Sequence, residues 1–283
     1  MRPRQWLKNS LLLVAPLAAG VIGEGDSIVK LGLAIAAFCL ASSATYLLND
    51  LRDREHDRAH PRKRLRPIAA GEISEGAALA FAAILAVTGF ALALAVGAEF
   101  VAVLATYAAL TSAYSLALRQ IVVVDLVAVA SGFVLRAIAG GVAVDVPISR
   151  WFLIVATFSS LFVVAGKRYG EKLTHEEAEH QEASRTVLAE YTLPFLRYVW
   201  ALASTVAVTA YCLWALEQAD GSDYGALYEL TILPFLLLML RYALLIDRGR
   251  AEAPEDVVLR DRQFATYALL WTVSFAVAVY VGG

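Results

Sequence analysis

The chain has 283 residues, of which 59% are hydrophobic and 18% are charged, and its formal net charge is -2. Soluble domains average ~45–50% apolar and ~25% charged residues, so this composition excludes an ordinary soluble domain, a disordered chain and a collagen-like repeat. Apolar runs of roughly 20 residues, the length that a helix needs to cross a bilayer, recur along the chain. Cys39 and Cys212 lie inside such runs and offer neither a disulfide framework nor a zinc motif. These features predict an integral membrane protein.

We predict an all-α bundle of nine membrane-spanning helices in a single domain that covers residues 1–283. The spans fall at about 10–24, 28–49, 75–97, 99–118, 122–145, 149–167, 191–216, 225–246 and 263–282. The first run is short and contains Pro16. Because no small-residue cleavage site follows it, we interpret it as a retained helix and not as a signal peptide. Helical caps are expected in the two long loops, 50–74 and 168–190.

Lysine and arginine are distributed unequally between the two sides of this predicted bundle. When the loops are assigned alternately, 20 of the 24 residues fall on one side. The positive-inside rule places that side in the cytoplasm. We therefore expect a multi-pass protein of the inner or plasma membrane, with a cytoplasmic N-terminus, cytoplasmic long loops and an external C-terminus.

Carboxylates follow the second predicted span in the segment NDLRDREHD. If the helix continues, Asn49, Asp50, Asp53 and Asp57 lie within about a quarter of its circumference. Carboxylates that crowd one face repel each other unless a cation lies among them. Oxygen ligands suit Mg²⁺, which commonly bridges to substrate phosphates. The alternative is a solvated helix end of mixed charge, but the register favours a metal site.

The next segment, HPRKRLRPIAAG, is strongly basic. Four cations lie within five residues of it: Arg62, Lys63, Arg64 and Arg66. They either hold anionic lipid head groups at the membrane surface or neutralise a polyphosphate beside the carboxylates.

Arg136 lies in the middle of the fifth predicted span. A guanidinium at that depth is costly unless it faces an internal cavity. Its expected partners are Asp125 or Asp145 on the same helix, or a bound phosphate. Aromatic residues in other spans, among them Tyr114, either line that cavity or pack.

A mixed polar segment, GKRYGEKL, follows the sixth predicted span. Lys167 and Glu171 lie one helical turn apart, so a structural ion pair is one interpretation. The acidic stretch that continues to Glu190 is typical of a solvated amphipathic helix, although its glutamates could also supply a second metal-binding or hydroxyl-binding group. Together these features favour a metal-bound anionic head group with a lipid tail as the substrate. A transporter for a phosphorylated solute is the alternative.

The segment NDLRDREHDRAHPRKRLRPIAAG resembles the first aspartate-rich motif of the UbiA superfamily of intramembrane prenyltransferases, N-D-x-x-D-x-x-x-D. The RPRQWLKN start, the GFVLRAIAGG stretch and GKRYGEKL are similar to the branch that transfers phosphoribose to decaprenyl phosphate. The chain departs from the prenyltransferase pattern because it has no Asp between Asp145 and Asp220, where those enzymes carry a second Asp-x-x-x-Asp pair. Cations and Glu171 stand in that region instead, which suits a sugar phosphate.

The resemblance implies a Mg²⁺-dependent transferase that moves 5-phosphoribose from phosphoribosyl diphosphate to a polyprenyl phosphate and releases diphosphate. It implies that Asn49, Asp50, Asp53 and Asp57 hold Mg²⁺ on the diphosphate. It further implies that Lys63 and Arg66 are supporting cations. Lys167, Tyr169 and Glu171 would orient the phosphoribosyl part. The candidates near the lipid phosphate are Arg136, Arg119 and Tyr114. In the family the product is a precursor of polyprenylphosphoryl arabinose for cell-wall arabinan.

Two other functions remain open, a prenyltransferase with an aromatic acceptor and the transporter. The predicted partners are the two substrates and the membrane. No nucleic-acid partner is expected, and the sequence leaves open whether the chain forms a homo-oligomer.

Overall fold

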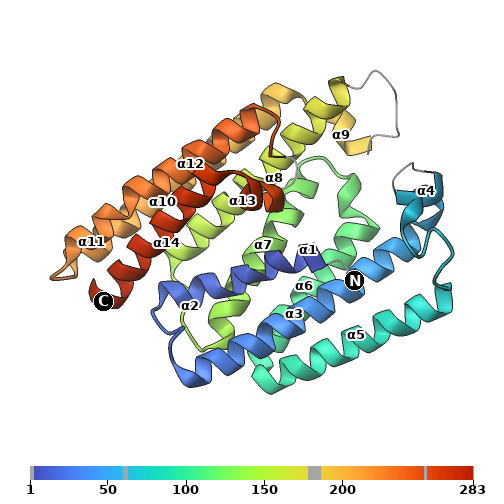
Figure 1. The fold of residues 1–283 in the computed structure, drawn as a ribbon, viewed down its shortest axis with the longest axis horizontal. Coiled ribbons are helices and arrows are strands. Elements are labelled where there is room, and N and C mark those ends of the chain that lie inside the picture. Colours follow the sequence, from blue (N-terminus) through green and yellow to red (C-terminus); the bar gives the residue numbers. More distant parts are fainter. Residues whose placement is uncertain (1–2, 60–62, 178–185, 252–253, 283) are drawn as a thin grey trace.

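The structure, a computed structural model, describes residues 3–59, 63–177, 186–251 and 254–282. All regular elements in this part of the chain are helices (Figure 1). The first half contains α1 (Pro3–Trp6), the 3-10 helix η1 (Leu7–Leu13), α2 (Val14–Ala18), α3 (Gly25–Arg52), α4 (Arg54–Ala59), η2 (Lys63–Leu65), α5 (Glu75–Val96), α6 (Ala98–Leu116), η3 (Leu118–Gln120) and α7 (Val124–Ala143). The second half contains α8 (Arg150–Glu177), α9 (Thr186–Glu190), α10 (Leu193–Asp220), α11 (Gly225–Leu230), α12 (Ile232–Asp247), α13 (Pro254–Arg260) and α14 (Arg262–Gly282).

Eight helical segments among the described residues are long and apolar enough to cross a membrane, which confirms the all-α membrane class. The predicted first span is shorter than expected, because it consists of η1 and α2 over Leu7–Ala18. At about 2.0 Å per 3-10 residue and 1.5 Å per α residue, this segment measures about 20 Å and falls short of a ~30 Å hydrocarbon core. The first predicted span, and with it the total of nine, therefore stays a prediction.

Two of the predicted boundaries shift in the structure. The sixth span does not end at residue 167, because α8 continues to Glu177 through residues that favour helix. The eighth is divided into α11 and α12 at Thr231. In the two long loops, α4 and η2 lie within 50–74 and α9 lies within 168–190. Residues 60–62 and 178–185, which include Arg62, Glu179 and Glu182, lie outside the described residues.

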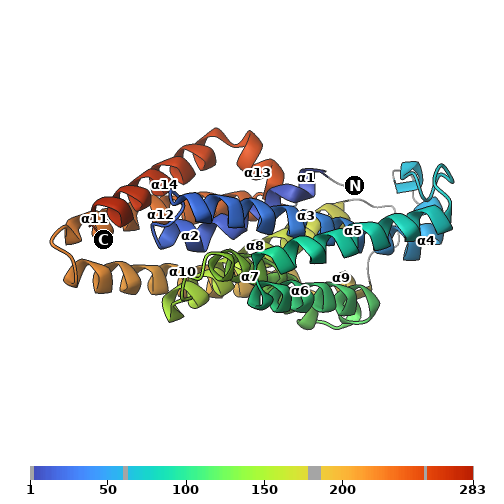
Figure 2. The same ribbon diagram turned by 90° about the horizontal axis from the view of Figure 1, so that it is seen from below.

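The helices pack in two groups that meet at α7. The most extensive contacts join α3 to α5 and α8 to α10, while α7 contacts α6, α8 and η1. One cluster of buried side chains lies among α3, α6 and α7, and another lies among α8, α10, α12 and α14. Figure 2 shows α3, α5 and α10 running roughly along the longest direction of the molecule. This arrangement makes α7 the central helix.

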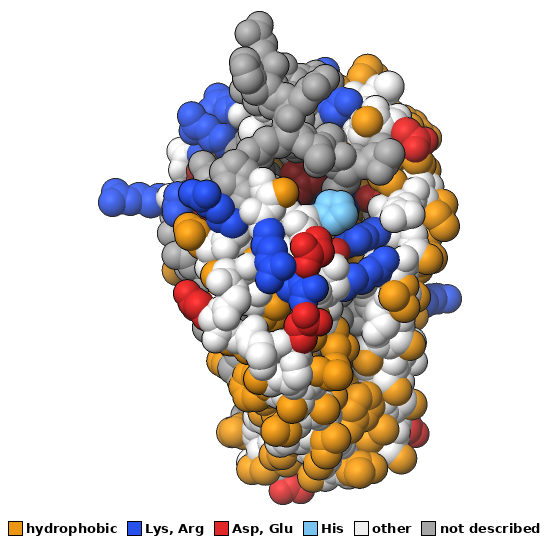
Figure 3. Space-filling model, turned by 90° about the vertical axis from the view of Figure 1, so that its right-hand side faces the viewer, with side chains coloured by type: hydrophobic (Ala, Val, Ile, Leu, Met, Phe, Trp, Pro, Cys, Tyr) orange, Lys and Arg blue, Asp and Glu red, His pale blue; other side chains and the backbone are white. Residues whose placement is uncertain are grey.

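The polar connections gather at one end of the bundle. The connections that hold α4, η3 and α9 lead from α3 to α5, from α6 to α7 and from α8 to α10, and therefore lie at the same end. Figure 3 faces the end that carries α4, where acidic and basic side chains intermingle above a hydrophobic flank. At this end Ser74 caps α5, because its hydroxyl accepts the Ala77 N–H at 3.2 Å.

Candidate functional site

The end of α3 positions the predicted carboxylates. Although α3 ends at Arg52 and α4 begins at Arg54, the helical spacing continues across the break. The N–H of Asp53 donates to the carbonyl of Asn49 at 2.9 Å, and the N–H of Asp57 donates to the carbonyl of Asp53 at 2.8 Å. These three residues thus follow one another at successive turns.

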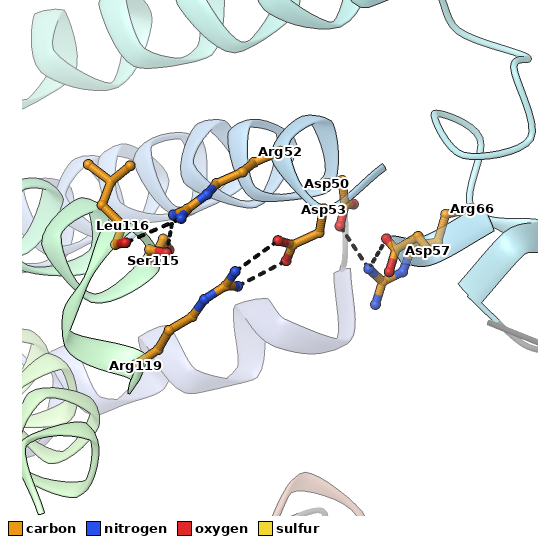
Figure 4. A network of polar contacts seen from close by, with 8 residues as sticks. All are labelled: Asp50, Arg52, Asp53, Asp57, Arg66, Ser115, Leu116 and Arg119. Carbon is orange, nitrogen blue, oxygen red and sulfur yellow. Dashed lines mark hydrogen bonds and ion pairs between the residues drawn. The ribbon is translucent and has the colours of Figure 1, made fainter. Parts of the chain in front are cut away.

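Arg66 is shared by two of the carboxylates (Figure 4). Its Nη1 donates to Asp57 Oδ2 at 2.5 Å and to Asp50 Oδ1 at 3.2 Å. Asp57 is buried, and the side chain of Asp50 is 17% exposed. The basic segment after α4 therefore folds back onto the carboxylates. Lys63, the other predicted cation of this segment, begins η2 on the exposed surface.

The third carboxylate pairs with a different helix end. Both Nη atoms of Arg119 lie 3.2 Å from the two carboxylate oxygens of Asp53. Arg52, the preceding residue, donates to the carbonyls of Ser115 and Leu116 at the end of α6. Because those carbonyls have no partner within the helix, Arg52 satisfies them and ties α3 to α6.

The three carboxylates thus form three ion pairs with two arginines, Arg66 and Arg119. Among the described residues, no three His, Cys, Asp or Glu side chains are arranged to hold a metal ion. The magnesium site at Asn49, Asp50, Asp53 and Asp57 therefore stays a prediction.

A cavity of about 170 Å³ lies beside this network, between η1, α3, α6 and α7. Three of the predicted site residues line it: Asn49, Tyr114 and Arg136. Lys8 and Tyr107 also line it. Asn49 belongs both to the cavity wall and to the Asn-Asp motif, so the cavity opens directly beside the carboxylates.

Arg136 faces this cavity and is buried, with 5% of the residue exposed. Its Nε donates to Asn9 Oδ1 at 2.9 Å, its Nη1 to the carbonyl of Gly132 at 2.7 Å and its Nη2 to the hydroxyl of Tyr107 at 2.6 Å. The guanidinium also lies over the Tyr107 ring, 4.6 Å from its centroid. The prediction that Arg136 faces an internal cavity is thus confirmed.

The carboxylate partners that we expected for Arg136 are wrong. Asp125 pairs with Arg168, and Asp145 pairs with Lys30 at 2.7 Å. The physical reason is the helix rise of 1.5 Å per residue, which separates positions 125 and 136 of one helix by about 16 Å.

A second polar network, which the sequence did not indicate, surrounds Arg168. Its guanidinium donates to Asp125 at 3.1 Å, to Glu171 at 2.6 Å and to the hydroxyl of Tyr114 at 3.1 Å. Arg168 and Asp125 are both buried. Since Tyr114 lines the cavity, it connects the cavity to this network on α7 and α8.

Tyr191 closes the second network from the segment before α10. Its hydroxyl donates to Asp125 and accepts the Val123 N–H at 2.7 Å. Val123 adopts a φ of 69°, a conformation that β-branched residues rarely occupy. Burial, and next the hydrogen bond with Asp125, raise the pKa of Tyr191, so its hydroxyl stays protonated and remains a donor.

The predicted residues of α8 lie on different faces of that helix. The Nζ of Lys167 lies 3.8 Å from Oε1 of Glu171, which confirms the structural ion pair. Glu171 also forms an ion pair with Arg168. Tyr169 is buried on another face, where Arg197 donates to its hydroxyl at 2.8 Å. Neighbouring positions of a helix differ by about 100° in direction, so the structure does not bring Tyr169 to Glu171.

Sequence reasoning missed Lys8, Asn9, Asp125, Arg168 and Tyr191 as members of these networks. A usable signal was present for two of them. Lys8 and Asp125 are ionisable residues beside or inside apolar runs, and such residues usually face protein interiors or cavities. Asn9 and Arg168 lie in RPRQWLKN and GKRYGEKL, two segments that carry the family resemblance, but neither segment indicates their partners. Tyr191 lies in no such segment.

The chain is similar to curated proteins that are named as phosphoribosyltransferases, over nearly its whole length. It is 44% identical to "Decaprenyl-phosphate phosphoribosyltransferase" of Mycolicibacterium smegmatis, covering 99% of this chain and 91% of that protein. It is also 44% identical to the protein of the same name from Mycobacterium tuberculosis, covering 100% of this chain and 93% of the relative.

Solved structures share the fold. A UbiA homologue from Archaeoglobus fulgidus bound to DMAPP and Mg²⁺ superposes with a TM-score of 0.72 at 17% identity, covering 99% of this chain and 97% of that one. Residues 10–267 match the UbiA prenyltransferase family. The chain therefore belongs to the UbiA prenyltransferase family.

Proposed function

We propose that this protein transfers 5-phosphoribose from phosphoribosyl diphosphate to a polyprenyl phosphate. An oxygen of the lipid phosphate forms a bond to C1 of the ribose, the bond from C1 to the diphosphate breaks, and diphosphate leaves. The observation that carries the proposal is the 44% identity, over almost the whole chain, to enzymes named for decaprenyl-phosphate phosphoribosyl transfer. The charge of the site supports it, because Lys167, Arg168 and Glu171 occupy the region in which a prenyltransferase would carry acidic pairs.

The donor set at the end of α3 has the oxygen chemistry that a divalent cation prefers, although its carboxylates are paired with arginines and are not all arranged around one point in the described structure. Asp50 and Asp57 converge on one nitrogen of Arg66, so two carboxylates already face a single cationic position. Asn49 and Asp53 add further oxygen donors, and oxygen ligands are those that Mg²⁺ prefers. Bound Mg²⁺ would stabilise the negative charge that develops on the departing diphosphate. The solved relatives from Archaeoglobus fulgidus bound to GPP or DMAPP also contain Mg²⁺.

The arginines of the first network supply charge to the same group. Arg66 and Arg119 neutralise the carboxylates in the structure, and each presents a guanidinium suited to bidentate phosphate binding. In the proposed reaction Arg66 contacts the diphosphate, with Lys63 as a further cation at the surface. The resemblance assigns Arg119 to the lipid phosphate, but we propose that it also contacts the diphosphate, because it pairs with Asp53. Lys167 and Glu171 orient the phosphoribosyl part through its phosphate and hydroxyl groups.

The acceptor needs no strong general base, because a phosphate oxygen is already an anion. Positioning then contributes most of the rate enhancement. Arg136 and Tyr114 line the cavity beside Asn49. In the proposed reaction they contact the phosphate of the lipid acceptor. We propose further that the chain forms one integral-membrane domain in the plasma membrane. The end of the bundle that carries Asp50, Asp53 and Asp57 would face the cytoplasm.

Radiolabelled phosphoribosyl diphosphate and a polyprenyl phosphate, incubated with membranes that contain the protein, test this function. We expect Mg²⁺-dependent label in the lipid fraction and its loss with EDTA. A parallel reaction offers a labelled prenyl diphosphate and 4-hydroxybenzoate. Label in the aromatic product alone would replace the proposal with an aromatic prenyltransferase, and no product in either reaction would contradict both enzyme functions.

A further inference from the structure

The hydroxyl of Tyr191 holds the N-terminal end of α7 from outside that helix. Tyr191 is buried, and its hydroxyl donates to the carboxylate of Asp125 and accepts the N–H of Val123 at 2.7 Å. Its ring stacks on the ring of Phe195, with the centroids 5.8 Å apart, so the hydroxyl is aimed in one direction. A residue of the connection between α8 and α10 thus fixes the point at which α7 begins.

Val123 has a backbone conformation that needs such support. Its φ of 69° and ψ of -43° lie near the γ-turn with positive φ, which is rare and strained, and a β-branched residue suits it poorly. A strained conformation persists only where the surrounding structure holds it. The hydrogen bond from Val123 to Tyr191 supplies such support, because it fixes the peptide group directly before the strained residue.

Backbone hydrogen bonds join Val123 to the turn that carries Arg119. The N–H of Ile121 donates to the carbonyl of Leu118 at 3.1 Å, and the N–H of Asp125 donates to the carbonyl of Ile121 at 3.0 Å. Val123 lies inside this chain of bonds, so its conformation sets the direction in which η3 leaves α7. The short helix α9 also contacts η3. The position of Arg119 therefore depends on the backbone at Val123.

Arg119 reaches the aspartate motif from that turn. Its two Nη atoms each lie 3.2 Å from a carboxylate oxygen of Asp53, in a bidentate arrangement. Because hydrogen bonds are lost beyond about 3.5 Å, a small shift of η3 would remove part of this contact. The Tyr191 hydroxyl thus lies between the two polar networks, bound directly to Asp125 in one and connected through η3 to Asp53 in the other.

We infer that Tyr191 is a positioning residue of the transfer reaction. Its hydroxyl holds the connection between α6 and α7 in the conformation that places the Arg119 guanidinium beside Asp53. Tyr191 acts through the backbone of Val123 and η3 and not through contact with a substrate. The inference deepens the proposed function and rests on it for the diphosphate that Arg119 contacts.

Equilibrium binding of Mg²⁺-diphosphate to the purified full chain in detergent tests the inference without turnover. Tyr191→Phe removes the hydroxyl and keeps the ring that stacks on Phe195. The matched control is Tyr211→Phe, within α10. It also removes a buried tyrosine hydroxyl with two hydrogen-bond partners, here the Thr231 hydroxyl and the Trp271 N–H. Thermal unfolding compares the stability of the two variants.

We expect Tyr191→Phe and Arg119→Lys each to weaken diphosphate binding about tenfold, because a charge-assisted hydrogen bond to the anion is lost. Both changes act on one guanidinium, so the double variant should bind within about twofold of Arg119→Lys. Tyr211→Phe should lower stability to a similar extent and keep binding within about twofold of the parent. Unchanged binding in either single variant, or losses that multiply in the double variant, would overturn the inference.

A second variant tests the route through Val123. Glycine adopts a positive φ without strain, and the exposed Val123 side chain loses little packing when it is removed. Tyr191→Phe combined with Val123→Gly should therefore fold even where Tyr191→Phe alone does not, and should bind diphosphate within about threefold of the parent. A folded double variant that binds as weakly as Arg119→Lys would contradict this route.

Turnover separates positioning from a purely structural role. Tyr191→Phe should raise the KM for phosphoribosyl diphosphate by about the factor by which diphosphate binding weakens. A purely structural role would reduce the folded fraction, lower kcat and leave KM unchanged, and that result would overturn the inference. If diphosphate binding depends on Tyr191 as expected but the parent transfers no phosphoribose, the positioning role stands and the proposed function fails.

Discussion

At the level of single residues, the two polar networks are each built around an arginine that binds several side chains. Arg66 serves two carboxylates, and Arg168 serves Asp125, Glu171 and Tyr114. Such sharing offsets the repulsion among acidic groups and satisfies several donors of one guanidinium at once. Removing one member therefore affects the others.

Neutralising the aspartates of the first network should abolish the transfer reaction. We expect Asp50→Asn and Asp53→Asn to lower phosphoribosyl transfer at least ~10²-fold, with Asp57→Asn close behind, because charge stabilisation at the leaving group is lost. The measurement is label transferred to lipid per milligram of purified protein. Asp145→Asn is the control, since that carboxylate pairs with Lys30 instead. Variants that retain a tenth of the parent activity would contradict this assignment.

Asp125→Asn should destabilise the fold. The substitution deprives buried Arg168 of a carboxylate, which costs on the order of 3 kcal/mol for a buried pair. Thermal unfolding of the detergent-solubilised protein measures the change. Asp247→Asn breaks the exposed pair with Arg197 and should change stability by no more than about 0.5 kcal/mol. Equal effects of the two substitutions would show that the Arg168 network contributes no more than a surface pair.

At the level of elements, the close approach of η1 to α7 builds the cavity. Lys8 and Asn9 belong to η1, and Arg136 belongs to α7. Glycine permits this approach, because a Cβ on Gly140 would overlap the backbone carbonyl of Leu12. In membranes, small residues at helix contacts allow such approaches between backbones.

Gly140→Ala should separate these two elements. Because the obstacle is backbone, η1 must shift, and we expect a loss of about 1–3 kcal/mol in stability together with weaker binding of the lipid acceptor. Thermal unfolding and equilibrium binding of farnesyl phosphate measure the two effects. Gly32→Ala is the control within α3, where no atom lies within 4 Å of an added Cβ. A Gly140→Ala variant that behaves like Gly32→Ala would exclude a tight contact between η1 and α7.

At the level of the whole molecule, charge is segregated along the bundle. The loops that carry most of the cations leave α3, α6, α8 and α12 at one end, and the ion pairs of Asp50, Asp53 and Asp57 lie at that end. Figure 3 shows acidic and basic side chains together on the face that carries α4. The positive-inside rule predicts that this end faces the cytoplasm.

Cysteine labelling in intact cells tests the orientation. In a parent with Cys39→Ser and Cys212→Ala, we expect a membrane-impermeant maleimide to label Asp223→Cys without permeabilisation and Glu72→Cys only after it. Both positions are exposed and lie in connections at opposite ends of the helices. The reverse labelling pattern would place the aspartate network outside the cytoplasm and contradict the proposed access of a soluble sugar donor.

The sequence by itself determined the features that depend on local pattern. The length of apolar runs predicted the membrane class and eight of the nine spans, since span length follows from helix rise and bilayer thickness. The spacing of Asn49, Asp53 and Asp57 predicted their succession at the end of α3, because helical periodicity is a local property. The mid-span position of Arg136 predicted that it faces a cavity, since an isolated guanidinium is unfavourable in lipid.

Only the tertiary structure decided which groups meet. Arg136 binds Asn9 across 127 positions of the chain, and Arg168 binds Asp125 across 43. Both pairings depend on how η1, α7 and α8 pack, and that packing is set by side-chain shape over the whole bundle and not by any short motif. The same reason explains why Tyr169 lies apart from Glu171 although the two are close in sequence. Side chains that are close in sequence can point to different faces of one helix, whereas the packing of helices brings together residues that are far apart in the sequence.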